Sequence, residues 1–114
     1  MTSENDFQLR QSVMTFYQLC RTEEIPENEL KRFVLKGKEI LVINRNMKFY
    51  CLDARCTHAG APLAEGELEN GVLQCPWHGS RFNIKNGLVI RGPAAKQLRT
   101  YNCRIEEDRL LVEL

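Results

Sequence analysis

The stretch CTHAGAPLAEGELENGVLQCPWHGS, residues 56–80, holds both histidines of the chain and two of its five cysteines. These ligand-type residues form two groups, Cys56-x-His58 and Cys75-x2-His78, separated by residues 59–74. Thiolate and neutral imidazole are the side chains best suited to zinc, iron and copper. Two loops that each supply one cysteine and one histidine therefore predict a metal site with four protein ligands.

Three interpretations of this spacing remain open. A structural zinc site is one, although zinc sites usually take two cysteines from one element and two histidines from another. A two-iron cluster is the second, in which one iron takes both thiolates and the other takes both imidazoles, as in a Rieske 2Fe-2S centre. Chance burial of four side chains is the third. It is disfavoured because the two groups use every histidine in the chain.

Length and composition limit the class of protein. With 114 residues, of which 43% are hydrophobic, the chain suits one compact domain. A formal net charge of +1 gives no electrostatic reason to expect a nucleic-acid or membrane partner. The longest apolar runs, such as 40–43, are far too short for a membrane span, and the polar start lacks the apolar segment of a signal peptide. We therefore expect a cytoplasmic location.

The cysteine count favours free thiols and metal ligands. Five cysteines are an odd number, and a chain without an export signal rarely carries a disulfide framework. Cys20, Cys51 and Cys103 lie within strand-like runs. For these three we expect buried structural thiols rather than additional metal ligands.

The distribution of β-branched and aromatic residues indicates an all-β domain from residue 13 onward. Turns are expected at Lys36-Gly37-Lys38 and at the Asn-Gly pairs 70–71 and 86–87. Polar residues 1–12 are expected to be a flexible tail, and the connection between Asp53 and Gly71 does not fit a strand. The expected strands are 14–20, 30–35, 39–45, 48–53, 71–75, 81–84 and 88–90, followed by a C-terminal hairpin of 101–106 and 110–114.

The segments CTHAGAPL and CPWHGSRFN, with the Asn-Gly turn that follows and RGPAA at 91–95, resemble a Rieske-type 2Fe-2S protein. The size is similar to that of a stand-alone Rieske ferredoxin. The resemblance implies the Rieske fold of stacked antiparallel sheets, in one domain of residues 13–114. A small cluster-binding subdomain, at about 54–92, is expected to be inserted into the larger base.

The resemblance also implies one 2Fe-2S cluster and its ligands. Cys56 and Cys75 would bind one iron, and His58 and His78 would bind the other at the exposed tip. A Ser80 hydroxyl hydrogen bond to the cluster is implied as well. Pro93, in Gly92-Pro93-Ala94, would belong to a loop that covers the cluster from a third side.

Departures from the respiratory-complex Rieske proteins narrow the expected cellular location and reduction potential. Those proteins carry the two cysteines of a bracing disulfide where this chain has Ala61 and Trp77, and a tyrosine hydroxyl where it has Phe82. The missing disulfide fits a reducing cytoplasm. The missing hydroxyl predicts a potential away from the upper end of the Rieske range of about −150 to +300 mV. The Trp77 side chain either packs against the protein, shields the cluster or forms a docking surface.

The leading functional expectation is a soluble one-electron carrier that links a flavin-dependent reductase to an oxygenase or another terminal redox enzyme. It is expected to be monomeric and not itself an enzyme, because four protein ligands leave no open metal position. Nucleic acid and membranes are not expected partners. The alternatives are a small redox subunit of a larger enzyme, such as an assimilatory nitrite reductase, and a zinc-stabilised interaction module. Arg55, Arg81 and Arg91 either steer an acidic partner or form a solvated face.

Overall fold

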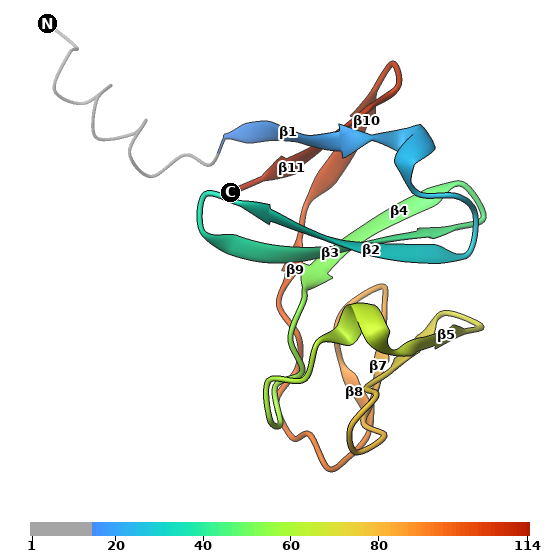
Figure 1. The fold of residues 1–114 in the computed structure, drawn as a ribbon, viewed down its shortest axis with the longest axis vertical. Helices are drawn as coiled ribbons and strands as arrows, with labels where there is room; N and C mark the ends of the chain where they lie inside the picture. The colour runs from blue at the N-terminus through green and yellow to red at the C-terminus, as the bar shows by residue number, and fades with distance from the viewer. Residues whose placement is uncertain (1–14) are drawn as a thin grey trace, which may run out of the picture.

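The computed structural model describes residues 15–114, and the tail expected at 1–12 lies outside this range. The described chain is built almost entirely from β-strands, in three antiparallel sheets arranged one above another in Figure 1. This confirms the all-β class with stacked antiparallel sheets that was expected from the sequence. None of the helices in the described part of the chain is long and apolar enough to cross a membrane.

The strands divide among the sheets as follows. The first sheet has the order β1 (Phe16–Arg21), β11 (Arg109–Glu113), β10 (Cys103–Glu106). The second sheet has the order β2 (Glu29–Leu35), β3 (Lys38–Arg45), β4 (Lys48–Asp53), β9 (Thr100–Tyr101). The third sheet has the order β5 (Glu67–Glu69), β6 (Val72–Gln74), β7 (Arg81–Asn83), β8 (Val89–Arg91). Two short 3-10 helices are η1 (Thr22–Glu24) and η2 (Leu63–Glu65).

The second sheet is buried on both faces, and this explains the apolar run in β3. Successive side chains of a strand point to opposite faces. Ile40 and Val42 enter the apolar core shared with the first sheet, while Leu41 and Ile43 enter the core shared with the third sheet. A strand between two cores has no polar face, so β3 reads as continuous hydrophobic sequence.

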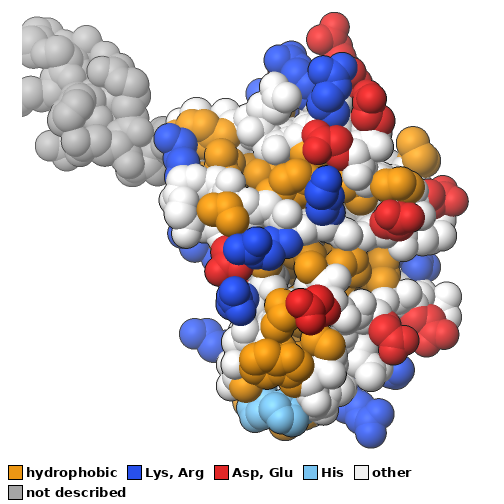
Figure 2. Space-filling model, in the orientation of Figure 1, with side chains coloured by type: hydrophobic (Ala, Val, Ile, Leu, Met, Phe, Trp, Pro, Cys, Tyr) orange, Lys and Arg blue, Asp and Glu red, His pale blue; other side chains and the backbone are white. Residues whose placement is uncertain are grey.

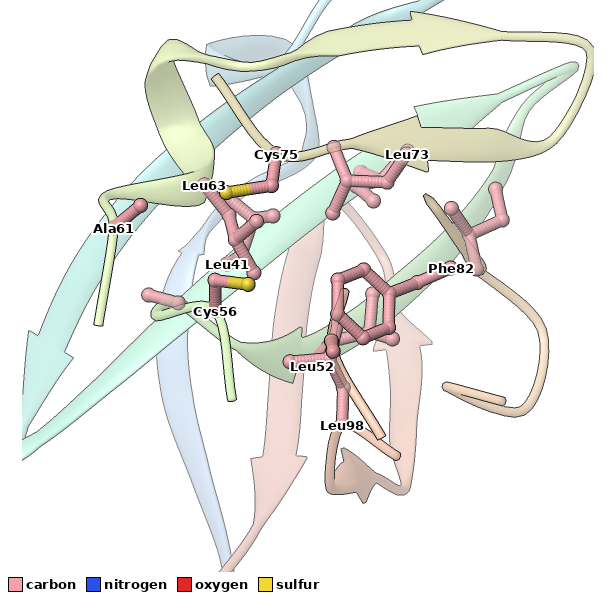
Figure 3. Packing of buried hydrophobic residues seen from close by; sticks show 13 residues of the cluster. Leu41, Leu52, Cys56, Ala61, Leu63, Leu73, Cys75, Phe82 and Leu98 are labelled. Carbon is pink, nitrogen blue, oxygen red and sulfur yellow. The ribbon is translucent and has the colours of Figure 1, made fainter. Parts of the chain in front are cut away.

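The third sheet and its connections, residues 54–98, form a lobe below the two-sheet base in Figure 1. The chain enters the lobe from β4 and returns to the base at β9. The lobe has no separate core, because Leu73, Phe82 and Leu98 of the lobe pack with Leu41 and Leu52 of the base (Figure 3). The lobe is therefore held firmly on the middle sheet.

Two-residue turns set the register of the hairpins. Lys36 and Gly37 have φ of 51° and 78°, and Asn70 and Gly71 have φ of 50° and 79°. Two consecutive positive φ angles are typical of the type I′ turns that match the twist of a hairpin. Both turns were expected from the sequence, and both join directly paired strands.

Two parts of the strand prediction are wrong. The expected strand 101–106 is divided at Asn102, because β9 pairs with β4 of the second sheet and β10 pairs with β11 of the first. The chain changes sheets there without losing its alternating pattern. The connection between Asp53 and Gly71 was expected to contain no strand, yet β5 forms at 67–69 by pairing with β6 across the Asn70-Gly71 turn.

Candidate metal centre

The two ligand-type loops have the same backbone closure although their sequences differ. In the first, the Cys56 N–H donates to the Ala61 carbonyl and the Gly60 N–H donates to the Cys56 carbonyl, both at 2.9 Å. In the second, the Cys75 N–H donates to Ser80 at 2.8 Å and the Gly79 N–H donates to Cys75 at 3.3 Å. Each loop thus closes five residues after its cysteine.

A glycine in the left-handed region allows each of these closures. Gly60 has φ +74° and Gly79 has φ +79°, a conformation that residues with a Cβ rarely adopt. The histidine lies two residues after the cysteine in the first loop and three residues after it in the second. Because the two loops close in the same way, both histidines lie at the same end of the lobe although their spacings from the cysteines differ.

The four predicted ligands are arranged as two pairs. Cys56 and Cys75 are 4% and 3% exposed, and both sulfur atoms lie within the apolar packing of the lobe (Figure 3). His58 and His78 are exposed, with ring centroids 5.1 Å apart. Figure 2 shows these two imidazoles together at the lower end of the molecule. The structure therefore has a buried thiol pair behind an exposed imidazole pair.

The pKa of the Cys56 thiol lies above its ordinary value, and burial is the largest cause. Burial raises the pKa of the Cys56 thiol, the backbone N–H groups of His58 and Ala59 lower it, and the neighbouring Cys75 thiol raises it. A positively charged metal removes the penalty of burying a thiolate, because a coordinated thiol is deprotonated outright. Peptide N–H groups aimed at the sulfur then stabilise the negative charge that remains.

The arrangement fits a two-iron cluster with mixed ligation. Such a cluster needs two thiolates on one iron and two imidazoles on the other. Within residues 15–114, no three His, Cys, Asp or Glu side chains gather where one ion would bind. The ligand-type side chains are paired two and two instead.

A segment outside the two loops contacts both of them. The Ala94 N–H donates to the Ser80 hydroxyl oxygen at 2.9 Å, and the Thr57 hydroxyl donates to the Lys96 carbonyl. Pro93 directly precedes Ala94 and is exposed. Ser80 is fully buried, and its oxygen accepts the Ala94 N–H, which leaves its own hydroxyl proton available as a donor. The resemblance placed Gly92-Pro93-Ala94 beside the site, but no sequence pattern predicted the hydrogen bond of Thr57.

Arg55 has a structural role that its exposed position did not suggest. Its guanidinium donates to the Gly60 carbonyl at 3.0 Å and to Glu39 at 3.1 Å. Arg32 donates to the other carboxylate oxygen of Glu39 at 2.7 Å. Hydrogen bonds from Arg55 and Arg32 hold the pKa of Glu39 below its ordinary value. The first loop is thus tied to β3 and β2 of the base.

Trp77 does not pack into the core, which was one of the expectations for it. Its side chain is 55% exposed, between the buried Cys75 and the exposed His78. It borders a hollow of about 370 Å³ together with Glu65 and Glu67. Phe82, in contrast, is fully buried in the apolar core of the lobe.

Comparison with known proteins identifies the family. Residues 15–102 match the family described as the Rieske [2Fe-2S] domain. The chain belongs to this Rieske family. The cofactor of the family is a 2Fe-2S cluster, which agrees with the paired thiols and imidazoles of the two loops.

Relatives of this Rieske chain include separate electron-transfer components and parts of longer proteins. The ferredoxin component of biphenyl 2,3-dioxygenase from Rhodococcus jostii is 33% identical over 101 residues, which are 89% of this chain and 94% of that one. Apoptosis-inducing factor 3 from Homo sapiens is 31% identical over 94 residues, which are 82% of this chain but 16% of that protein. The chain therefore spans about a sixth of the length of that relative.

Solved structures share the fold. One chain from the complex of reduced oxygenase and oxidised ferredoxin in carbazole 1,9a-dioxygenase superposes with a TM-score of 0.79 at 26% identity. The match covers 85% of this chain and 91% of that chain. The correspondence extends over the base and the lobe together.

Proposed function

We propose that this protein is a one-electron carrier whose 2Fe-2S cluster is held by Cys56, His58, Cys75 and His78. The observation that carries the proposal is the pair of exposed imidazoles in contact at the end of the lobe, in front of two buried thiols. When bound, the cluster takes up and releases a single electron. Mixed ligation raises its potential above that of an all-cysteine cluster, because two neutral imidazoles replace two negative thiolates.

The side chains around the ligands have separate tasks in this proposal. The apolar packing around Cys56 and Cys75 keeps water from the sulfur side, while the exposed imidazoles form the edge where an electron enters and leaves. The Ser80 hydroxyl, whose oxygen accepts the Ala94 N–H, would use its own proton to hydrogen-bond a bound cluster. Pro93 and its neighbours close the third side, as the contacts of Ala94 and Lys96 with the two loops support.

The proposed partners are a flavin-dependent reductase as donor and an oxygenase as acceptor. Ferredoxin components of dioxygenase systems are among the relatives, which supports the oxygenase. We propose that a monomer acts in the cytoplasm, with residues 13–114 as one domain and about 54–92 as its cluster-binding part. The core shared between lobe and base supports a single domain. The protein transfers electrons and catalyses no reaction of its own.

The family relationship to a segment of a longer protein supports a second candidate. This candidate is a redox module within a larger assembly, and it is favoured by the match to about a sixth of a longer relative. A small subunit of an assimilatory nitrite reductase would be one such module. A carrier exchanges between partners and purifies alone, whereas a subunit remains bound. Affinity purification from the native source, followed by light scattering, distinguishes the two.

The decisive experiment is spectroscopy on the isolated protein. We expect about two irons and two sulfides per chain, with a visible absorption that dithionite bleaches. The EPR spectrum of the reduced protein is expected to have a lower average g value than an all-cysteine ferredoxin. A colourless protein that contains zinc would refute the proposal and favour an interaction module.

Trp77 provides a test of the docking edge. Because its side chain is 55% exposed and lies next to His78, Trp77→Ala is expected to slow electron transfer to the oxygenase while the potential stays unchanged. Ile105→Ala is the matched control, since Ile105 is 47% exposed on β10 of the base, away from the lobe. Equal transfer rates for both variants and the unmodified protein would contradict a docking role for Trp77.

A further inference from the structure

A second pair of thiols lies in the base, in the apolar core between the first and second sheets. Cys51 on β4 is 2% exposed, whereas Cys103 on β10 is partly exposed. The Cys103 thiol donates to the carbonyl of Phe49 on β4 at 3.4 Å, and Phe49 lies two residues before Cys51 on that strand. Cys51 is the register partner of Tyr101, which lies two residues before Cys103. The two cysteines are therefore neighbours across two sheets within one core, and a disulfide between them requires only that their sulfur atoms approach to bonding distance.

The two thiols differ in reactivity and in access. The neighbouring Cys51 thiol lowers the pKa of the Cys103 thiol, and Cys103 together with burial raises the pKa of the Cys51 thiol. A thiol with a lowered pKa and access to solvent is the one that attacks. Cys103 is thus the attacking thiol, and Cys51 is the resolving thiol behind it.

Cys103 opens onto a surface hollow that suits a small anionic reagent. The hollow has a volume of about 230 Å³ and is lined by apolar side chains, which include Met47 and Ile105, and by two cations, Lys48 and Arg104. Arg104 is paired with Glu106 at 2.8 Å, which leaves Lys48 as the cation without an ion pair to a described side chain. A small disulfide that carries carboxylates fits this combination of apolar lining and positive charge.

The position of the pair in the chain gives the bond a structural consequence. Residues 52–102, the stretch between Cys51 and Cys103, contain the whole lobe and all four proposed cluster ligands. Cys51 is the register partner of Tyr101, so both connections to the lobe leave the base beside this pair. A bond between Cys51 and Cys103 would close the lobe into a covalent loop at its root.

We propose that Cys51 and Cys103 form a reversible dithiol–disulfide pair that is oxidised by a small anionic disulfide of the glutathione class. The Cys103 thiolate attacks one sulfur of the reagent, the reagent's S–S bond breaks, and one reduced thiol leaves with a proton. The Cys51 sulfur then attacks the mixed disulfide, the intramolecular S–S bond forms, and a second reduced thiol leaves with the other proton. The protein loses two electrons and two protons, and the reagent gains them.

The test is oxidation of the cluster-loaded protein with glutathione disulfide, followed by tryptic mass mapping. Trypsin places Cys51 in residues 49–55, Cys103 in 100–104, Cys20 in 11–21 and both ligand cysteines in 56–81, so each product is distinguishable. We expect the peptides 49–55 and 100–104 to be linked, and dithiothreitol to release them. The linked form should melt at least about 5 °C higher, because the bond closes a loop of about fifty residues.

Three variants make the assignment specific. Cys51→Ala is expected to stop at a glutathione adduct on Cys103, Cys103→Ser to give neither adduct nor link, and Cys20→Ala to retain the link. The visible spectrum is recorded in parallel as a measure of the cluster. The proposal is overturned if the wild-type protein keeps both thiols free, if the link involves Cys20, or if Cys51→Ala gains no adduct.

Discussion

Removal of the Ser80 hydroxyl is expected to change stability and potential through two different bonds. Ser80 is fully buried and its oxygen accepts the Ala94 N–H at 2.9 Å. In Ser80→Ala this N–H loses its partner at a residue that is 4% exposed. An unpaired buried donor costs about 1–3 kcal/mol. The melting temperature is therefore expected to fall by roughly 5–15 °C.

The effect on the potential depends on the proton of the hydroxyl. If that proton is donated to the cluster, it stabilises the reduced state more, because the reduced state carries one more negative charge. A hydrogen bond to a charged group contributes about 1.5–3 kcal/mol. If about 1.4 kcal/mol of this is specific to the reduced state, Ser80→Ala lowers the potential by about 60 mV. Protein-film voltammetry measures this shift directly.

Thr57→Val is the matched control for this experiment. The Thr57 hydroxyl also ties a ligand loop to residues 92–96, but it donates to the Lys96 carbonyl. Its removal should lower the melting temperature and leave the potential unchanged. A Ser80→Ala protein with a lower melting temperature and an unchanged potential would refute the reasoning, since Ser80 would then only brace the loop.

Three further predictions concern other parts of the site and fold. His78→Ala is expected to prevent assembly of the visible chromophore, whereas Leu88→Ala, at a residue 48% exposed, should retain it; a fully coloured His78→Ala protein would argue against the proposed ligation. Gly87→Ala should cost about 2–5 kcal/mol in a denaturant titration, because φ is +75° and the new Cβ would lie 2.1 Å from the Leu98 carbonyl oxygen. Gly37→Ala, at φ +78° with open space around it, should cost only about 1–2 kcal/mol, and equal losses would show that the contact with Leu98 is relieved. The pKa of Glu39 is held below its ordinary value of 4.5 in the folded protein. The ion pairs of Glu39 therefore stabilise the fold fully above pH 4.5, and this contribution is lost as the pH falls through the lower folded-state pKa. Glu39→Gln should therefore melt slightly below the wild-type protein at pH 7 and approach it in acid; a difference independent of pH would contradict this.

Local sequence was sufficient for the features that depend on neighbouring residues. The Lys36-Gly37 and Asn70-Gly71 turns were correctly predicted because positive φ angles are tolerated by few residue types. The short apolar runs were correctly read as strands because their composition suits a buried, pleated surface. The cysteine and histidine spacing limited the metal chemistry because few side chains bind iron or zinc.

Features that depend on which segments meet in space were not accessible from the sequence. Residues 101–106 kept one alternating pattern across two sheets, because alternation records which face is buried and not which strand is the neighbour. Strand β5 was missed because three polar-rich residues become a strand only through pairing with β6. Exposure of Trp77 likewise follows from the course of its loop, since an aromatic residue between two ligands suits a core or a surface equally well.

The sequence by itself determined the two turns and the β-rich class, and it limited the candidate ligands to two cysteines and two histidines, since each of these follows from the chemistry of residues close together in the chain. Only the tertiary structure decided the 5.1 Å separation of the two imidazole rings, the contacts of residues 94–96 with both loops, and the contact of Cys103 with β4 beside Cys51. Those arrangements join residues tens of positions apart. They depend on the packing of three sheets, which no local pattern records.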